Sequence, residues 1–547
     1  MITTYLSEAI RSAVAAAGFE PPASIGLETP RERAHGDLAT NVAMQLASRA
    51  RANPRKLAEA IVAALKPALD PARIQGVHIA GPGFINFSYH PEVVRRSLAE
   101  LLEAGPRYGR GEWGRGERVL LEFVSANPTG PLNVVSARAA AVGDSLVRLF
   151  RASGFESRSE FYVNDAGNQV RLLGESLRAR MREAEGAPLQ IPENGYHGEY
   201  LKDLAVGLGP EGRARLEAEE AREPGACTRH ALGVLLAGQR QDLEMFGVRF
   251  DRFFHETELH QGRQVELALE ELRRAGFVDS REGAQWFRST AFGDVKDRVL
   301  VRGSGEPTYF LADVAYHRDK HDRGFGHAIN LLGPDHHGVV ARMQAAMQAL
   351  GYPRDWLEIL IVQQVNLIQG GQAVEMSKRA GKLVTLRELV AEVGPDVARF
   401  FFLMRGVSTH LDFDLDLARE HSDKNPVFYV QYAHARACNV ERFAAENRVD
   451  PGRADLSLLG EPEEMELIKV LMQLPLMVEV AVRSREPQRM TQYLISVAQA
   501  FHPFYQKHRV VTSEEALSAA RLRLVQGVRL VLANGLDLVG VSAPEKM

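Results

Sequence analysis

Residues 122–144 carry the stretch that decides the fold, EFVSANPTGPLNVVSARAAAVGD. The residues around its start, 119–124, are mostly apolar, as in a buried strand, and residues 127–131 have the Pro and Gly content of a turn. The Ala-rich segment that follows predicts a helix over residues 133–152. A strand, turn and helix in this order deliver a helix N-terminus to an anion. The stretch therefore predicts either a nucleotide-phosphate site or an ordinary strand–helix connection.

Length and composition limit the classes of protein that fit. The 547 residues are too many for one hydrophobic core, so two to four domains are expected. Lys and Arg number 66 and Asp and Glu 70, a net charge of −4 that gives no overall sign of nucleic-acid binding but leaves local basic patches open. Two distant cysteines, Cys227 and Cys438, predict reduced thiols and a cytoplasmic protein. No run of 18 apolar residues occurs, so no membrane span is expected.

The pattern along the chain predicts an α/β multidomain protein with three parts. Residues 1–110 form a small N-terminal α/β domain, in which residues 77–89 predict two strands around a Gly-Pro-Gly turn. Residues 117–405 form a Rossmann-type domain with a parallel sheet. Its strand candidates, separated by helical patterns, are residues 119–124, 159–163, 328–332 and 357–368. A polar, helix-rich insertion is expected at about residues 170–290, and residues 406–547 predict an all-α bundle.

A second motif, EMSKRAGKLVTLREL, occupies residues 375–389 and follows the Gly-rich sequence IQGGQ. Lys378, Arg379 and Lys382 are placed to meet a polyphosphate. A loop that closes lysines over a leaving pyrophosphate supplies charge where it develops. The alternative is a solvated charged surface, which is the usual role of such a run.

A third motif lies within residues 308–338. Tyr309 and Asp313 are four residues apart, so on a helix they share one face. Gly333 and Asp335 follow a strand candidate, at the position where open α/β sheets bind ligands. This motif favours a nucleotide site.

The same segment also allows a metal hypothesis. His317 and His321 are four residues apart, and His336 and His337 follow. A zinc-dependent hydrolase could use such histidines, although the segment offers neither an HExxH arrangement nor a cysteine ligand. This alternative stays open at the level of sequence.

Taken together, these motifs resemble the class I aminoacyl-tRNA synthetases, and among them the arginyl-tRNA synthetase family, over essentially the whole chain. Residues 35–47 and 81–87 are similar to that family's N-terminal additional domain. Residues 122–144 lie where the family carries its HIGH signature, and EMSKR lies at its KMSKS loop. Residues 425–436 and 540–547 are similar to its helical anticodon-binding domain.

The resemblance implies a two-step reaction. The carboxylate of L-arginine attacks the α-phosphate of ATP and releases pyrophosphate, and the arginyl group then passes to the 3′-terminal adenosine of tRNA(Arg). Such a displacement depends on positioning and charge stabilisation. ATP is expected to enter with Mg²⁺, no tightly bound metal is expected, and the chain is expected to act as a monomer.

The resemblance also implies roles for individual residues. A guanidinium is planar and always charged, so carboxylates hold it best. The residues implied for arginine are Glu122, Ser125, Asn127, Tyr309 and Asp313. Those implied for ATP are Thr129, Asn133, Ser136, Gly333, Asp335, His337, Met376, Ser377, Lys378 and Arg379, of which Asn133, Ser136 and Lys378 would be catalytic. Those implied for tRNA are Asn86, Tyr429, Tyr432, Arg436 and Met547, although the tyrosines could instead pack between helices.

Two departures from the family pattern qualify this interpretation. Where the family usually has His-Val-Gly-His, this chain has Asn133-Val134-Val135-Ser136, and Val135 fills space that a glycine leaves open. Glu375 replaces the first lysine of the second signature, whereas Lys378 keeps the other. We favour an active enzyme, because the pocket residues, Lys378 and both RNA-facing ends match. The alternative is a non-catalytic tRNA-binding paralogue with a degraded adenylation site.

Overall fold

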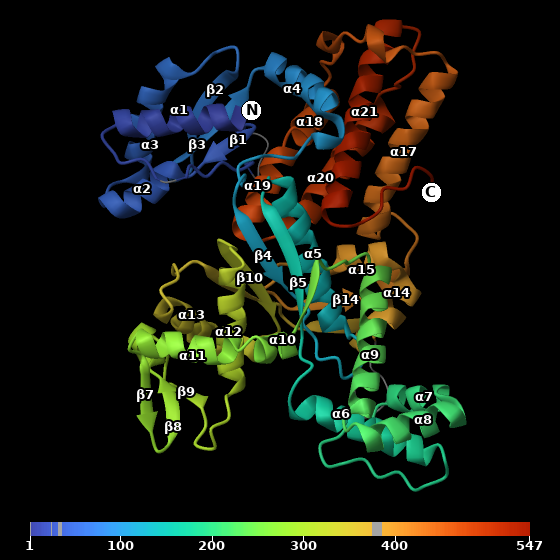
Figure 1. Ribbon diagram of the computed structural model, residues 1–547. Coiled ribbons are helices and arrows are strands. Elements are labelled where there is room, and N and C mark those ends of the chain that lie inside the picture. The colour runs from blue at the N-terminus through green and yellow to red at the C-terminus, as the bar shows by residue number, and fades with distance from the viewer. Residues whose placement is uncertain (1, 23, 31–34, 375–384) are drawn as a thin grey trace.

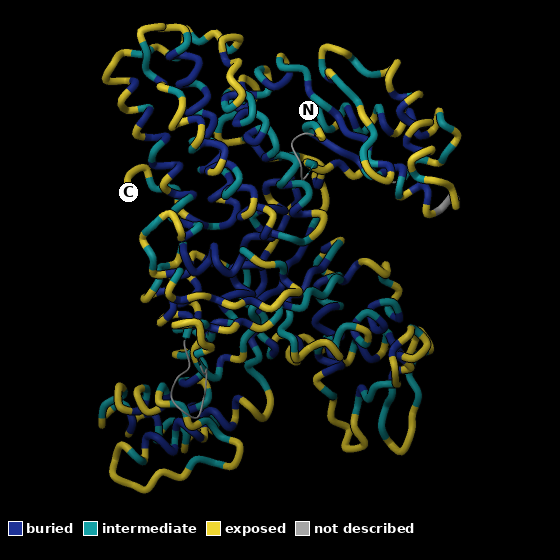
Figure 2. Tube along the Cα trace, turned by 180° about the vertical axis from the view of Figure 1, so that it is seen from behind, coloured by how far each residue is buried: buried dark blue, intermediate teal, exposed yellow. Residues whose placement is uncertain are grey.

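The computed structural model describes residues 2–22, 24–30, 35–374 and 385–547. Figure 1 shows an N-terminal unit, a central sheet, a C-terminal helical bundle and two smaller lobes. Buried residues follow the central sheet and the C-terminal helices (Figure 2). None of the helices in these described ranges is long and apolar enough to cross a membrane.

The N-terminal unit is a three-stranded antiparallel sheet of order β1-β3-β2 with three helices. Its elements are α1 (Ile2–Ala16), β1 (Leu38–Thr40), α2 (Val42–Ala50), α3 (Pro54–Leu65), β2 (Ile74–Ala80) and β3 (Phe84–Tyr89). The strand pair predicted around the Gly-Pro-Gly turn is confirmed. Gly83 closes that turn with φ 140°, and a Cβ there would lie 2.9 Å from the carbonyl oxygen of Pro54. A side chain at this position would therefore push the hairpin away from α3.

Helix α4 (Pro91–Ala104) leaves this unit and packs on the C-terminal bundle. Arg95 donates from Nε to the carbonyl oxygen of Leu459 at 2.9 Å, and Asn534 donates from Nδ2 to that of Gly105 at 3.1 Å. The predicted boundary at residue 110 groups α4 with the N-terminal unit, whereas these contacts tie it to the bundle. The domain boundaries themselves stay predictions.

The central sheet has five parallel strands in the order β11-β10-β4-β5-β6. They are β4 (Arg118–Glu122), β5 (Glu156–Val163), β6 (Arg252–His255), β10 (His327–Leu332) and β11 (Leu357–Ile361). The predicted parallel sheet and its first three strand candidates are confirmed. The fourth candidate is wrong as one strand, because residues 357–368 divide into β11 and β12 (Val365–Gln369). Strand β12 belongs to another sheet, with β13 (Gln372–Ala373) and β14 (Leu411–Asp414).

The strand order reverses between β4 and β10, and this places the site. From β4 the chain passes through α5 (Val134–Ala152) to β5 and then β6 on one side, while β10 and β11 lie on the other side. Ligands of such sheets bind outside the carboxyl ends of the strands at this switch point. The signature stretch follows β4 directly, so it begins at the carboxyl ends of the strands.

The predicted insertion is wrong as one block, because β6 interrupts it. One lobe lies between β5 and β6, and the second lies between β6 and β10 (Figure 1). The first contains α6 (Asn168–Glu183), α7 (Glu199–Gly207), α8 (Gly209–Arg222) and α9 (Ala226–Met245). The second contains α10 (Glu256–Gln261), α11 (Gln264–Arg274), β7 (Val278–Arg281), β8 (Ala284–Phe287) and β9 (Arg298–Val301), followed by α12 (Tyr309–Asp322). Helix α13 (His337–Ala349) joins β10 to β11.

The C-terminal part is helical apart from β14, which lies inside the range predicted as all-α. Its helices are α14 (Leu386–Val393), α15 (Pro395–Phe402), α16 (Leu415–Arg419), α17 (Pro426–Glu446), α18 (Pro462–Leu471), α19 (Leu474–Ser484), α20 (Gln488–Lys507) and α21 (Glu515–Leu538). The predicted helical bundle is confirmed for residues 426–538. Helices α17, α20 and α21 pack against one another and contribute to the largest apolar core (Figure 1).

Arg399 on α15 joins the end of the bundle to the signature helix α5. The side chain is buried, and its guanidinium donates to Asp144 Oδ2 at 2.5 Å and to the carbonyl oxygen of Val539 at 3.1 Å. Gly540 has φ 67°, and a Cβ there would lie 2.2 Å from Nη2 of Arg399. The turn after α21 therefore needs glycine to pass over the guanidinium.

Candidate active site

The arginine-pocket residues start at the carboxyl end of β4. Glu122 is the last residue of that strand, is buried, and pairs in register with Asn330 on β10. The next turn is strained, since Val124 has φ 68° and Ser125 φ 39°, values that L-residues seldom adopt. This turn lets Ser125 Oγ donate to Glu122 Oε1 at 3.0 Å and accept from the backbone N–H of Tyr162 at 3.1 Å. The strain thus places Ser125 beside Glu122.

Helix α12 supplies two further predicted arginine ligands. Tyr309 begins the helix and is 57% exposed, and Asp313 lies one turn further on. The structure confirms the predicted helical setting of this pair. Burial, followed by the charge of Glu122, raises the pKa of Asp313 to about 7, and Glu256 adds to the rise. Three carboxylates therefore meet where a cationic side chain would relieve their repulsion.

Sequence reasoning missed three residues of this pocket. Lys320 is fully buried, and its Nζ lies 2.6 Å from Glu122 Oε2. Its position two helical turns after Asp313 was a usable signal, because such residues share a helix face. Glu256 begins α10, and burial raises its pKa. Burial, followed by Glu256, also raises the pKa of Tyr162. No periodicity links Glu256 or Tyr162 to the pocket, since each comes from a different element.

Asn133 serves as the N-cap of α5. Its side chain accepts a hydrogen bond from the backbone N–H of Ser136 at 2.9 Å, as capping asparagines do. Its Oδ1 is therefore used, and its Nδ2 group is the atom that can donate to a phosphate. The backbone N–H group of Val135 lies in the first turn of α5, where such groups have no partner within the helix. An asparagine here thus keeps both the helix cap and an anion donor.

The signature loop is braced by the first lobe. Gln239 on α9 donates from Nε2 to the carbonyl oxygens of Asn127 at 3.2 Å and Gly130 at 2.8 Å. Tyr200 on α7 donates to the carbonyl oxygen of Thr129, and the Asn127 amide donates to Gln169 Oε1 at 3.0 Å. The side chains of Asn127 and Thr129 therefore start from a backbone that the lobe holds in place.

The remaining predicted ATP residues divide into two groups. One group follows β10 at the carboxyl ends of the strands and consists of Gly333, Asp335 and His337. Of these, Asp335 and His337 are exposed. Met376, Ser377, Lys378 and Arg379 lie outside the described residues. After that gap the backbone of Thr385 bridges Asn133, and Leu386 donates to the carbonyl oxygen of Leu132 at 2.8 Å. The chain after the gap therefore lies next to the first signature.

The contacts of two histidines account for them without a metal. His317 is buried, with Nδ1 2.7 Å from the carbonyl oxygen of Asp313 and Nε2 2.8 Å from Asn330 Nδ2. His321 stacks on Tyr352 with ring centroids 3.8 Å apart. Within the described ranges, no group of three or more His, Cys, Asp or Glu residues could hold a metal ion. The hydrolase alternative therefore finds no site in this part of the chain.

Comparison with known proteins adds to this geometry. Three family models match: "Arginyl tRNA synthetase N terminal domain" at residues 2–89, "tRNA synthetases class I (R), catalytic domain" at 98–399 and "DALR anticodon binding domain" at 430–547. The chain is 46% identical to an arginine–tRNA ligase of Desulforamulus reducens, over 100% of this chain and 99% of that protein. The chain belongs to the arginyl-tRNA synthetase family.

Two further proteins are similar to this chain. An arginine–tRNA ligase of Bacillus subtilis is 46% identical, over 99% of this chain and 98% of that protein. The solved arginyl-tRNA synthetase of Thermus thermophilus has a TM-score of 0.81 at 23% identity and covers 100% of both chains. The identity of the second is low, so that likeness shows the fold alone.

Tyr432, Arg436 and Met547 fall within residues 430–547, which the anticodon-binding model matches. Tyr429 lies one residue before that range, and Asn86 lies in the N-terminal unit. Tyr432 on α17 is 44% exposed, and the Arg436 guanidinium lies 4.5 Å from the ring centroids of both Tyr432 and Tyr505. Tyr429 is half-buried and packs on His502, so the packing alternative describes Tyr429 better than Tyr432. These tRNA roles stay predictions.

Two of the predicted tRNA residues lie at the N-terminal unit and the chain end. Asn86 is buried on β3, the middle strand of its sheet, so it presents little surface to RNA. Met547 is exposed, and the segment before it lies on α17 through His434 Nδ1 and the carbonyl oxygen of Pro544, 2.9 Å apart. The segment before Met547 therefore lies on the tyrosine-bearing helix, and a role of Met547 in RNA binding stays a prediction.

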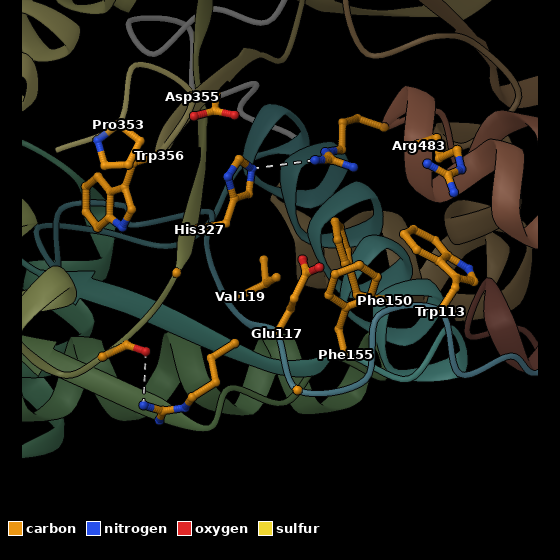
Figure 3. A pocket seen from close by; sticks show the side chains of 15 residues that line it. Trp113, Glu117, Val119, Phe150, Phe155, His327, Pro353, Asp355, Trp356 and Arg483 are labelled. Atoms are coloured by element: carbon orange, nitrogen blue, oxygen red, sulfur yellow. Dashed lines mark hydrogen bonds between the residues drawn. The ribbon is translucent and has the colours of Figure 1, made fainter. Parts of the chain in front are cut away.

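A separate cavity of about 700 Å³ lies at the amino ends of the central strands. It is lined by Val119 near the start of β4 and His327 at the start of β10. Figure 3 shows Trp356 on one side and Trp113 with Phe155 on the other. Its location at the amino ends of the strands separates it from the signature loop.

Replacing Val135 with glycine tests the altered signature. Val135 is half-buried, and it is not one of the described hydrophobic side chains that pack on the three apolar cores. We therefore expect Val135→Gly to lower the KM for ATP several-fold, with a helix-propensity cost of about 1 kcal/mol. Steady-state kinetics and a thermal melt check this. Unchanged ATP kinetics with a lower Tm would show that the valine serves packing instead.

Proposed function

We propose that this protein ligates L-arginine to tRNA(Arg) through an arginyl-adenylate at the expense of ATP. The supporting observation is that the carboxylates of Glu122 and Asp313 interact at the carboxyl end of β4, the strand from which the chain leads into α5. Asp313 would receive the guanidinium, and the helix start would receive the ATP phosphates. The full-length relatives named arginine–tRNA ligase support the same activity.

In the proposed first step, a carboxylate oxygen of arginine attacks the α-phosphorus of ATP. The bond to the bridging oxygen breaks, and pyrophosphate leaves with the electron pair. Ser125 and Asn127 would hold the α-amino and carboxylate groups, while Asn133, Ser136 and Lys378 would stabilise charge on the phosphates. Mg²⁺ is proposed to enter with ATP and to neutralise phosphate charge. No residue of this chain is assigned to it.

Aminoacylation of tRNA with labelled arginine tests the proposal. Label should reach acid-precipitable tRNA(Arg) only when ATP is present, and citrulline, which lacks the charge, should not compete. The alternative of a non-catalytic tRNA-binding paralogue finds no support in the relatives' names. Binding of tRNA without any transfer of label would nevertheless favour that alternative over ours.

The proposed tRNA surface makes a testable prediction. Bases of single-stranded RNA stack on aromatic rings at about 1–3 kcal/mol each. Replacing Tyr429 and Tyr432 together with alanine should therefore raise the KM for tRNA roughly tenfold or more. Because Tyr432 is the more exposed, it should account for most of the effect. The KM values for arginine and ATP should stay unchanged.

Phe443→Ala provides the matched control, because Phe443 is an exposed aromatic residue on the same helix, α17. It should leave the KM for tRNA unchanged. Binding of tRNA should also weaken steeply as salt rises, since phosphate contacts release counterions. A double variant that charges tRNA normally would remove this surface from RNA binding.

We also propose that the protein is a cytoplasmic monomer. The two cysteines are free and buried, which is compatible with a reducing compartment. Light scattering at the concentrations used for kinetics would test the oligomeric state directly, and a mass twice that of the chain would contradict the monomer.

A further inference from the structure

A chain of buried hydrogen bonds runs beneath the arginine pocket from Glu122 to Asp313. Lys320 Nζ donates to Glu122 Oε2 at 2.6 Å and to Asn330 Oδ1 at 2.9 Å. The Asn330 amide then lies 2.8 Å from His317 Nε2, and His317 Nδ1 lies 2.7 Å from the carbonyl oxygen of Asp313. The chain thus connects β4, α12 and β10 through side chains that are all buried.

The direction of every bond in this chain follows from its lysine. An ammonium group only donates, so Asn330 must accept with its oxygen and present its NH₂ group to His317. His317 therefore accepts at Nε2 and donates from Nδ1 to the carbonyl of Asp313, which fixes a neutral tautomer. Burial, followed by the charge of Lys320, lowers the pKa of His317 well below its usual range, in agreement with that tautomer.

The same lysine holds the Glu122 carboxylate in position and pairs with its charge. One carboxylate oxygen meets Lys320, and the other accepts from Ser125 Oγ at 3.0 Å. The ammonium also lies 4.3 Å from the ring centroid of Tyr316, and Lys320 has no exposed surface. A bare carboxylate at this depth would cost far more than a paired one. Glu122 is thus held in place, and its charge is compensated.

We propose that Lys320 is a positioning residue of the arginine site. Its ammonium group fixes the Glu122 carboxylate and cancels its charge, so that Asp313 can ionise and receive the substrate guanidinium. Lys320 touches neither the substrate nor ATP, and it acts by holding Glu122 and by the effect of its own charge on Asp313. This inference rests on the proposed function, because it concerns how the arginine pocket of that reaction is charged.

The charges that face Asp313 support this role. Glu122 on β4 and Glu256 on α10 raise its pKa, whereas Arg342 on α13 and Lys320 on its own helix lower it. The phenol of Tyr162 on β5 lies among the same three carboxylates. Removing Lys320 would leave two acids facing Asp313 with Arg342 as the opposing charge. Ionisation of Asp313 would then require a higher pH.

A double-mutant cycle at Lys320 and Glu122 tests the proposal. The variants are Lys320→Met, Glu122→Gln and the double variant, and kcat/KM for arginine is measured in tRNA aminoacylation from pH 6 to 9. In the unaltered protein this value should fall as pH drops through about 7, because a protonated Asp313 cannot pair with the guanidinium. Lys320→Met should raise the midpoint by about one pH unit and the KM for arginine about tenfold. Glu122→Gln should lower the midpoint, and the double variant should restore it.

Lys469→Met is the matched control. Lys469 on α18 pairs with Asp37 at 2.7 Å, far from the pocket in the fold, so its loss should leave both the midpoint and the arginine KM unchanged. The KM values for ATP and tRNA should change less than twofold in every folded variant.

Three outcomes would overturn the proposal. The first is a Lys320→Met protein with raised KM but an unmoved midpoint, which indicates a merely structural lysine. The second is a control variant that shifts as much as Lys320→Met. The third concerns the case in which Lys320→Met does not fold. The comparison of Glu122→Gln with the double variant then tests the proposal, and equal midpoints for these two variants would overturn it. Failure of the unaltered protein to charge tRNA would instead reject the proposed function, which separates the two claims.

Discussion

Asp313→Ala should lower kcat/KM for arginine by roughly 30- to 1,000-fold, equivalent to about 2–4 kcal/mol for a charge-assisted bond in a semi-buried pocket. The loss should fall mainly on the KM for arginine, because Asp313 is proposed to bind the guanidinium and not the reacting carboxylate. Steady-state aminoacylation at saturating ATP and tRNA measures it. A change in arginine affinity below threefold would show that the pocket is assigned wrongly.

The same variant should not destabilise the fold. The folded-state pKa of Asp313 is about 7, above its usual value, so the fold favours the protonated form. Stability therefore falls as pH rises from the unfolded pKa to about 7, and removing the carboxyl removes this penalty. The Tm at pH 8 should hold or rise. Asp322→Ala is the matched control, because Asp322 lies on the same helix and pairs at 3.0 Å with Arg318, away from the three carboxylates.

Lys378→Ala should slow arginine activation by about 10²–10³, the usual loss when one donor to developing charge is removed. Lys378 stands seven residues before Thr385, whose backbone bridges Asn133 at the start of α5. The chain is therefore tied next to the proposed phosphate site. Rapid-quench measurement of pyrophosphate release checks the rate of this step.

Binding of tRNA should be nearly intact in Lys378→Ala, because the lysine is proposed to act on phosphates of ATP. Lys296→Ala, an exposed lysine in the second lobe, should change neither quantity. An equal loss of tRNA affinity in Lys378→Ala would place this segment in the RNA interface.

Local patterns predicted the parts of the fold that local forces decide. The helix α5 and its start at Asn133 follow from the turn chemistry and the Ala-rich run, and the structure has them within one residue. Strand β6 was missed, because its four residues lie within a long helical stretch and gain their role from pairing with β5. Residues 357–368 have the sequence pattern of one strand. The N–H of Val362 still donates to the carbonyl oxygen of Leu332 on β10, but the N–H of Gln363 donates to that of Val407. The chain therefore leaves the central sheet here, and β11 ends.

The candidate site shows the same division. Tyr309 and Asp313 could be predicted, because four-residue spacing on a helix is a local signal. The pair Glu122–Lys320 could not, since 198 residues separate its members and only the sheet order brings them together. The brace from Gln239 to Gly130 is likewise a contact between distant segments, 109 residues apart. Sequence pattern finds such residues singly, and folding alone assigns their partners.

The contact between Arg399 and the turn after α21 has a consequence for biosynthesis. The carbonyl of Val539 accepts from Arg399, and Ser145 on α5 lies within 3.5 Å of the same oxygen. Domains usually fold in order as they leave the ribosome. Here the surroundings of the nucleotide helix stay unfinished until residue 539 has been translated and has left the ribosome. A nascent chain stalled before residue 539 would therefore lack a contact that holds α5 and α15 together.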